Sequence, residues 1–402
     1  MRLLRNSQRL ASFALLCAGA IACASGLPTQ TPPDSFEDLA ARARADVDSN
    51  PAEAVILFQK ALALRPEWVE GWFYMGSDLF ALRRHAEARD AFRRGLALSS
   101  RNGTAYGFLG LCEHELGDFD QALADLNKSE TLGTGPDPDF ELMVRQHAAL
   151  ILIRQQAFDE AIDQLGPLSR RGANSPEVTE TLGLCALAQA RQPETLSARA
   201  HTVANLAGKA LWANLARSSA EAEERFHELV ALYPDEPGVH YAHGVYQMEI
   251  DQHAALDEFE KELKANPAHW PSMLVIAFLR TRNGEPEAGL QMAQKAMELQ
   301  PARQRWVSHI AIGHAYLNMG QPEKAIPELE AAVKQQPANT SVHFYLEKAY
   351  RLAGRKEDAQ REKAEFVRLK AQEDPLALPG PAGMGRDASR DAGSEAATGP
   401  VR

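Results

Sequence analysis

The sequence predicts an all-α protein, an α-solenoid of about ten helix–turn–helix units, and three observations support this fold class. Residues 69–102 hold two apolar stripes with helical spacing, one through Trp72 and Leu79 and one through Ala88 and Phe92. The same pattern returns 34 residues later and again in the last third of the chain. A proline closes several of the repeats, where a second helix has to stop. Because neither helix can bury its apolar face alone, each unit must pack on its neighbours.

Small residues mark the points where the two helices of a unit should touch. Gly76 and Ala88 take these places in residues 69–102, and Gly110 and Ala122 take them one period later. Gly313 lies at the same place in the unit that fits the pattern best, at about residues 306–337. A large side chain at any of these places would push the two helices apart, so we expect them to be close helix contacts.

The repeat divides the chain into six regions. Residues 191–217 lose the pattern, and we interpret them as a seam, either an irregular helix pair or a hinge. The tail is rich in Gly, Pro, Ala and Asp and has no aromatic residue, a composition that predicts disorder. The regions are a signal peptide (1–24), a linker (25–34), an N-terminal array (35–190), the seam (191–217), a C-terminal array (218–370) and the tail (371–402).

The pattern resembles the tetratricopeptide repeat, a 34-residue helix–turn–helix unit. The resemblance implies a right-handed superhelix whose first helices line a concave groove, and it implies a protein or peptide partner in that groove. Phe73 and Ser77 stand where chaperone-binding relatives carry a Lys and an Asn, so binding of an acidic chain terminus is not expected. The alternative is that the inward residues pack between adjacent first helices and are covered. The residues that the resemblance places on the inner face include Phe73, Phe80, Tyr241, Met248, Phe278, Ile310 and Phe344.

Charge and motifs argue against several functions. The formal charge is −11 and no basic cluster is present, which argues against a nucleic-acid partner. His240 and His243 lie three residues apart, but no carboxylate or cysteine pair at ligand spacing accompanies them, so we expect them to pack. No catalytic motif was found, and we expect a non-enzymatic scaffold or adaptor without cofactor or metal. The alternatives are a helical accessory subunit of an envelope enzyme system and a periplasmic enzyme with a site at the seam, near His201 or Trp212.

The N-terminus has the pattern of an export signal. Arg2, Arg5 and Arg9 precede an apolar run at residues 10–21, which is too short to span a bilayer. The sequence Ala22-Cys23-Ala24 then offers a cleavage site, and it also resembles a lipobox in which Cys23 would be lipidated. We expect a periplasmic, secreted or lipid-anchored protein, in which Cys23 is the only link to a membrane. An uncleaved N-terminal helix is the alternative.

Two cysteines remain after the signal, Cys112 and Cys185. Each follows a helix-contact glycine by two residues, so both take the same place in a first helix. Because the two repeats that carry them are not adjacent, we expect no disulfide between them. We interpret both as small buried apolar residues.

Overall fold

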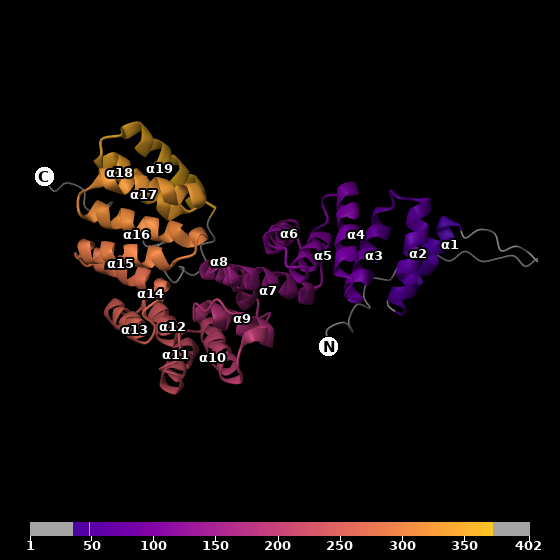
Figure 1. Cartoon of the computed structure of the whole chain (residues 1–402), viewed down its shortest axis with the longest axis horizontal. Helices are drawn as coiled ribbons and strands as arrows, with labels where there is room; N and C mark the ends of the chain where they lie inside the picture. The colour runs from indigo at the N-terminus through magenta and orange to yellow at the C-terminus, as the bar shows by residue number, and fades with distance from the viewer. Residues whose placement is uncertain (1–34, 48, 373–402) are drawn as a thin grey trace, which may run out of the picture. The chain divides into compact units, whose positions relative to one another are not determined.

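The computed structural model describes residues 35–47 and 49–372, and every regular element in these ranges is a helix (Figure 1). The expected signal peptide with Cys23, the linker and most of the tail lie outside the described residues. The helices are α1 (Phe36–Asp46), α2 (Pro51–Leu64), α3 (Val69–Ala81), α4 (His85–Leu98), α5 (Gly103–Glu115), α6 (Phe119–Leu132), α7 (Pro138–Arg154), α8 (Phe158–Arg170), α9 (Pro176–Ala186), η1 (Pro193–Thr195), α10 (Ala198–Leu215), α11 (Ser219–Leu232), α12 (Val239–Gln247), α13 (Gln252–Ala265), α14 (Trp270–Arg282), α15 (Pro286–Leu299), η2 (Ala302–Gln304), α16 (Arg305–Asn318), α17 (Pro322–Gln335), α18 (Thr340–Leu352) and α19 (Lys356–Lys370).

The helices pack as consecutive pairs, which confirms the predicted all-α helical-repeat fold. Pairs such as α3–α4, α5–α6 and α16–α17 each form one repeat. Adjacent repeats also pack on one another, as α4 does on α5, α15 on α16 and α10 on α11. The described residues hold nineteen α-helices, which is close to the two helices in each of the expected ten units.

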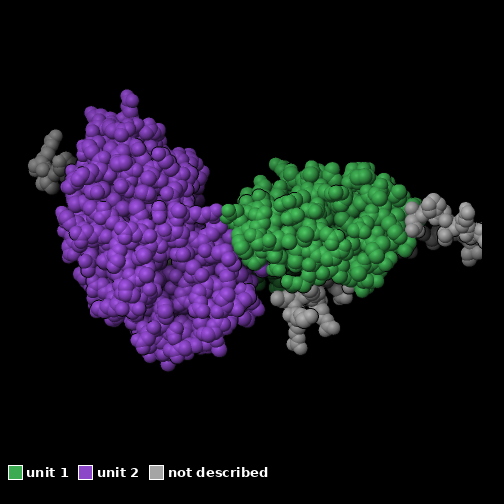
Figure 2. Space-filling model, in the orientation of Figure 1, with its two compact units in different colours: residues 1–144 green, residues 145–402 purple. Residues whose placement is uncertain are grey.

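The chain divides into two compact units, residues 1–144 (unit 1) and residues 145–402 (unit 2) (Figure 2). The boundary falls within α7. The sequence predicted a seam at residues 191–217. That stretch lies inside unit 2, where most of it forms the single helix α10. Before α10, a connection at residues 187–197 contains only the short helix η1 as a regular element.

Local sequence explains where many helices begin. The side chains of Asn50, Asn102 and Asn339 each accept a hydrogen bond from a backbone N–H of the first turn, as good N-caps do. Ser175 and Ser197 do the same for α9 and α10. Proline occupies the first turn of several helices, including α15 and α17, where its missing N–H removes no helical bond. Capping side chains and prolines in the local sequence therefore determine where these helices begin.

The predicted helix contacts are present in both units. A Cβ atom added to Gly76 would lie 2.8 Å from the ring of Phe92, and one added to Gly313 would lie 2.6 Å from Cγ of Leu329. Distances this short are not found for real Cβ atoms, so the two helices touch at these glycines. The core of unit 1 gathers around Phe58, and much of the core of unit 2 lies along α14–α18. No helix in the described part of the chain is both long and apolar enough to cross a membrane.

Changing Gly313 to Leu should destabilise unit 2 strongly. The new side chain would meet Leu329, which is fully buried, so α16 and α17 would have to separate. Overpacking of this kind costs roughly 1–3 kcal/mol. Thermal unfolding followed by circular dichroism would measure the loss, and an unchanged melting temperature would show that the contact is not as tight as described.

Candidate partner-binding groove

Three of the residues expected on the inner face of unit 2 are buried. The exposed fractions of Tyr241, Phe278 and Ile310 are 3%, 1% and 0%. The ring of Phe278 on α14 lies 4.8 Å from that of His314 on α16, which lies 5.0 Å from that of Tyr345 on α18. These rings fill the space between adjacent first helices, which is the alternative that the sequence left open. A partner cannot reach the three side chains in this conformation.

The inner side of unit 2 is also covered in part by its own chain. Oε1 of Gln156, in the turn between α7 and α8, accepts a 2.7 Å hydrogen bond from Nε1 of Trp270 on α14. A small cavity of about 30 Å³ lies beside this bond, with Asp159, Glu160, Tyr241 and Trp270 among its lining residues. The start of α8 therefore lies against the first helices α12 and α14. Burial raises the pKa of Asp159 well above its usual value, and it also raises the pKa of Glu160.

The other two expected residues of unit 2 are half-buried. Phe344 packs on Tyr345 and on Phe366 of α19, with ring centroids 5.3 and 5.8 Å apart. Met248 packs against the apolar cluster that contains Tyr241. Both side chains keep some accessible surface, so they remain candidates for contact with a partner.

The two expected residues of unit 1 are also half-buried, and each contacts a neighbouring helix. Phe73 lies over Gly95 of α4, where an added Cβ would come within 2.7 Å of the ring. Phe80 makes edge-to-face contacts with His85 and with Phe108 of α5, at 5.3 and 5.4 Å between ring centroids. The role of the seven inner-face residues in partner binding stays a prediction. Because the other three are buried, only Phe73, Phe80, Met248 and Phe344 remain candidates for contact with a partner.

Unit 1 carries a second apolar surface that the inner-face argument missed. Leu64, Leu98 and Leu132 are the last residues of α2, α4 and α6, and each follows the previous one by 34 residues. Their exposed fractions are 59%, 49% and 37%, large for leucine side chains. We call these three residues the leucine row. The signal was in the sequence, because each leucine falls at the same place in successive repeats and one helical turn beyond the buried stripe.

The histidines that were weighed as metal ligands join first helices to second helices. Nδ1 of His240 and Nδ1 of His243 lie 2.6 and 3.4 Å from the same oxygen of Glu258, and Nζ of Lys261 lies 2.6 Å from the other oxygen. Burial alone would raise the pKa of Glu258, but these partners outweigh burial and lower its pKa to about 2. Related pairs recur one repeat apart, because His309 contacts Glu328 at 2.7 Å and His343 contacts Glu362 at 2.8 Å. We interpret the pairs as packing contacts within repeats.

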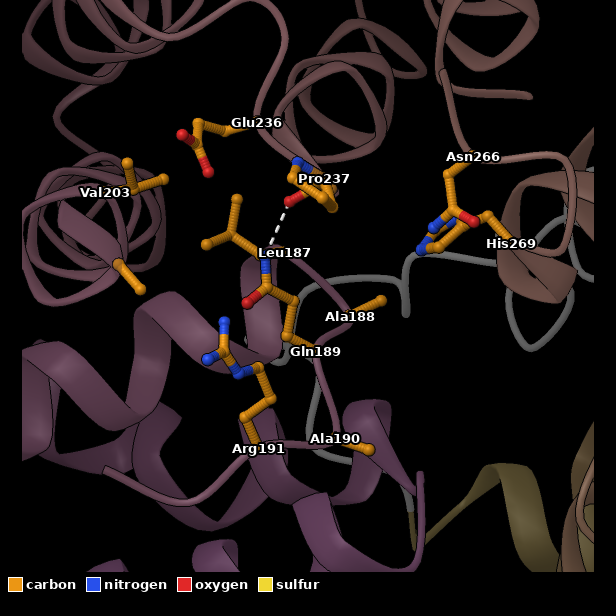
Figure 3. Close-up of a pocket in the computed structure, with 12 residues that line it drawn as sticks. Leu187, Ala188, Gln189, Ala190, Arg191, Val203, Glu236, Pro237, Asn266 and His269 are labelled. Atoms are coloured by element: carbon orange, nitrogen blue, oxygen red, sulfur yellow. Dashed lines mark hydrogen bonds between the residues drawn. The ribbon is translucent and has the colours of Figure 1, made fainter. Parts of the chain in front are cut away.

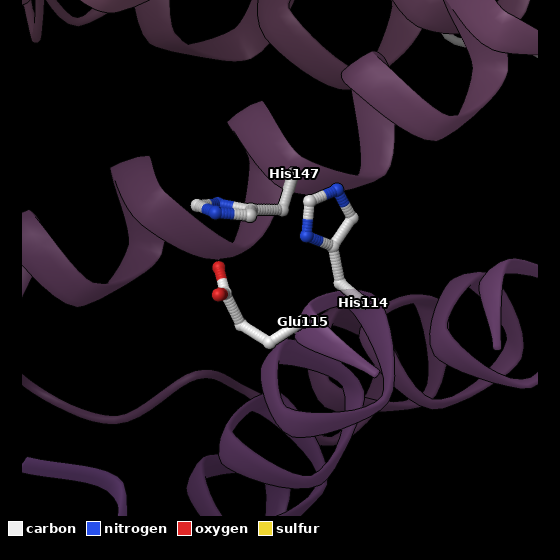
Figure 4. Close-up of side chains that lie close together, drawn as sticks. All are labelled: His114, Glu115 and His147. Carbon is white, nitrogen blue, oxygen red and sulfur yellow. The ribbon is translucent and has the colours of Figure 1, made fainter. Parts of the chain in front are cut away.

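Two other groups of side chains were candidates for chemistry. His201 on α10 contacts the carboxylate of Glu180 on α9, so it helps to hold these two helices together. His114 and Glu115 lie at the end of α5 in unit 1, whereas His147 lies on α7 in unit 2 (Figure 4). Because these three residues are divided between the two units, they do not form a site of either unit.

The two cysteines after the expected signal are buried free thiols, as predicted. Burial raises the pKa of the Cys112 thiol to about 12, and it also raises the pKa of Cys185. Both side chains therefore stay protonated at neutral pH and behave as small apolar residues.

Two segments of the chain match a known family model. The family model of the tetratricopeptide repeat matches residues 73–136 in unit 1 and residues 310–364 in unit 2. No curated protein matches the chain as a whole. The described helix pairs and the two matched segments agree on the type of repeat.

Solved structures similar to the chain include a MamA crystal structure at 16% identity, with a TM-score of 0.34 and coverage of 40% of this chain and 93% of that chain. The MamA RS-1 double mutant has 18% identity and a TM-score of 0.36, and the match covers 45% of this chain and 99% of that chain. Yeast Tom70 has 12% identity and a TM-score of 0.37, and the match covers 88% of this chain and 81% of that chain. At these identities the similarity concerns the helical-repeat fold alone.

Proposed function

From the premise that this chain is a tetratricopeptide-repeat protein, we propose that it is a non-enzymatic scaffold that binds a protein or peptide partner. The observation that carries the proposal is the leucine row, in which accessible apolar side chains recur at one place in three successive repeats. An extended or helical partner that runs along the repeats would meet one such side chain in each unit. Apolar side chains that are this exposed in a row mark an interaction surface more often than single ones do.

The half-buried inner-face residues offer a second contact region for the same function. Phe344 and Met248 belong to unit 2, and Phe73 and Phe80 belong to unit 1. Aromatic side chains contribute a large share of the binding free energy when a partner covers them. Because each of these four side chains already contacts neighbouring helices, they suit the edge of an interface better than its centre.

Replacing the leucine row should weaken partner binding without loss of the fold. We expect Leu64→Ser, Leu98→Ser and Leu132→Ser together to reduce capture of a partner by about tenfold or more, because three apolar contacts are lost at once. The measurement is a quantitative pull-down from the envelope fraction, followed by titration of the captured protein. Circular dichroism should show unchanged helicity, since all three side chains are exposed.

A matched control changes three exposed apolar residues that lie outside the row. Ile250, Leu352 and Val367 have exposed fractions of 62%, 50% and 58%, so Ser at these places removes a similar amount of apolar surface. This variant should bind like the parent. If Met248→Ser with Phe344→Ser abolishes binding and the leucine-row variant does not, the inner face is the contact surface. Equal binding by all variants would contradict both surfaces.

We also propose that the protein is exported, with the N-terminal segment removed on the way. The basic residues, the apolar run at 10–21 and the Ala22-Cys23-Ala24 site support this. Mass spectrometry of the protein extracted from the cell envelope should find Ser25 as the first residue, or a lipid-modified Cys23. A mature protein that still begins with Met1 would contradict export by cleavage.

A further inference from the structure

Unit 2 contains a cavity of about 290 Å³ at the place where the repeat pattern is lost. Its walls come from the end of α9 and the connection that follows, from the start of α10, and from the loops that precede α12 and α14. Figure 3 shows Gln189 and Arg191 on the connection after α9 and His269 on the loop before α14, all at the edge of this space. Ordinary repeats leave no such space, because a second helix follows directly after a short turn. The long connection at residues 187–197 creates it here.

His269 supplies a buried hydrogen-bond donor without a partner. Its Nδ1 accepts the backbone N–H of Ser272 at 3.3 Å, as the N-cap of α14, so the ring proton is on Nε2. The residue is 7% exposed, and its Nε2 has no hydrogen-bond partner. Burial lowers the pKa of His269 to about 3, so the ring is neutral and Nε2 can only donate. Buried donors are nearly always paired, which makes an acceptor in the cavity the simplest explanation.

The exposed side of the cavity carries a positive charge. Arg191 is exposed, and its guanidinium group makes one hydrogen bond, from Nη2 to the carbonyl oxygen of Thr195 at 3.4 Å. A guanidinium group has five N–H donors, so most of its capacity is available to an anion. Glu236, the carboxylate that lines the cavity, is held by Arg199 and so does not neutralise Arg191.

The rest of the lining is apolar or already bonded. Leu187, Ala188 and Val203 contribute apolar side chains to the lining. The amide of Gln189 is fixed by a 2.6 Å hydrogen bond to the carbonyl oxygen of Pro237. Asn266 also lines the cavity, and its side chain is hydrogen-bonded to Glu262. A ligand therefore meets one cation, one buried neutral donor and several apolar side chains.

We propose that this cavity binds a small organic acid. Its carboxylate would pair with Arg191, and a second oxygen, from a carbonyl or hydroxyl group, would accept the proton of His269 Nε2. A short aliphatic body between the two oxygens would contact the apolar side chains of the lining, Leu187 among them. The volume equals that of roughly ten water molecules, which limits the ligand to a small molecule. This site lies in unit 2, whereas the leucine row belongs to unit 1, and it does not depend on the proposed scaffold function.

The test uses three probes of similar size that differ in one group each. These are 4-oxopentanoate, which has both oxygens, pentanoate, which lacks the second acceptor, and 2-pentanone, which lacks the carboxylate. Isothermal titration of the full chain should show saturable binding of 4-oxopentanoate, binding of pentanoate at least fivefold weaker, and no measurable binding of 2-pentanone. Absence of saturable binding by both acids, or equal affinity for all three probes, would overturn the proposal.

Two variants assign the binding to this cavity. Arg191→Met keeps an exposed side chain of similar length and should weaken binding of both acids about tenfold or more, since a charge-assisted pair is lost. Arg305→Met removes an exposed arginine elsewhere in unit 2 and should change neither affinity. If the two variants have the same affinity for the acids, the acids bind through nonspecific attraction to surface arginines, and the assignment to this cavity is wrong.

A third variant tests the buried donor. His269→Asn retains an N-cap oxygen for α14 but lacks the donor in the place of Nε2. It should remove the preference for 4-oxopentanoate over pentanoate while it leaves the affinity for pentanoate unchanged. Should this variant fail to fold, the Nε2–H resonance of His269 in the parent provides the same test, because it should shift on addition of 4-oxopentanoate and not of pentanoate. A preference that survives in the variant, or a resonance that does not move, would contradict the role of His269.

Discussion

Changing Gly208 to Ala should destabilise unit 2 by about 3 kcal/mol or more, the top of the usual range for overpacking. A Cβ at Gly208 would overlap the carbonyl oxygen of Thr179 on α9 and would lie 2.8 Å from the carbonyl carbon. Gly183 meets α10 in the same way, because a Cβ there would lie 2.5 Å from the carbonyl carbon of Ala204. Both neighbours are backbone atoms, which cannot move to a new rotamer, so α9 and α10 would have to separate.

A glycine of the neighbouring helix α8 provides the matched control. At Gly166 an added Cβ would lie 3.8 Å from its nearest neighbours, an ordinary contact. Alanine is favoured over glycine inside a helix, so Gly166→Ala should be neutral or stabilise by up to about 1 kcal/mol. Thermal unfolding should therefore show opposite shifts, with a fall of roughly 6–12 °C for Gly208→Ala in a unit of this size. Equal melting temperatures for the two variants would show that α9 and α10 are not in backbone contact.

The repeat made one kind of contact predictable from the sequence. Gly76 and Gly313 were expected at helix contacts because the same spacing of small and large residues returns through the chain, and both lie against a large buried side chain. Gly208 lies in the stretch without this pattern, so the spacing gave no information on its role. A different signal was available there, since Ala200, Ala204 and Gly208 follow each other at intervals of four and place small residues on one helix face.

The inner face was harder to predict, for a physical reason. The spacing of residues places Phe278 toward the inside of the superhelix, but it does not say how closely adjacent first helices approach. Here they approach closely enough for Phe278, His314 and Tyr345 to pack in a row. The contact between α14 and the turn that precedes α8 could not be predicted either, because the hydrogen bond from Trp270 to Gln156 joins residues 114 positions apart.

The cavity at the seam shows a similar limit. Loss of the pattern after residue 186 indicated that the structure would change there, and the structure replaces a short turn by the connection at 187–197. The sequence could not show that Arg191 and His269, which are 78 positions apart, line the same space. Such a pair depends on how three helices meet around one connection, which no periodicity encodes.

Unit 2 should lose stability in mild acid through His314. Burial, together with the nearby positive charges of Lys348 and Arg282, lowers the pKa of this histidine to about 3. In the unfolded chain its pKa is about 6.5. The unfolded state therefore takes up a proton that the folded state does not. The stability associated with neutral His314 is complete above about pH 6.5 and is lost as the pH falls from there toward 3.

The size of the effect follows from the same linkage. One proton taken up only by the unfolded state changes the free energy of unfolding by about 1.4 kcal/mol per pH unit, or about 2 kcal/mol between pH 6.5 and pH 5. His314→Met fills a similar volume without a titrating group. Denaturant unfolding at pH 7.5 and pH 5.0 should show a smaller loss of stability for this variant than for the parent, by about 2 kcal/mol.

The comparison of variant with parent is needed because other groups act in the opposite direction. Burial raises the pKa of Asp159, Glu160 and Glu262 in the same unit, so these carboxyl groups favour the folded state more as the pH falls. The parent and the variant both contain these carboxyl groups, so their effect cancels when the losses of stability of the two proteins are compared. His253→Gln, a change on the exposed surface of the same unit, controls for the loss of one histidine. If His314→Met shows the same loss between the two pH values as the parent, the imidazole is protonated in the folded state and is not enclosed by Phe278 and Tyr345 as described.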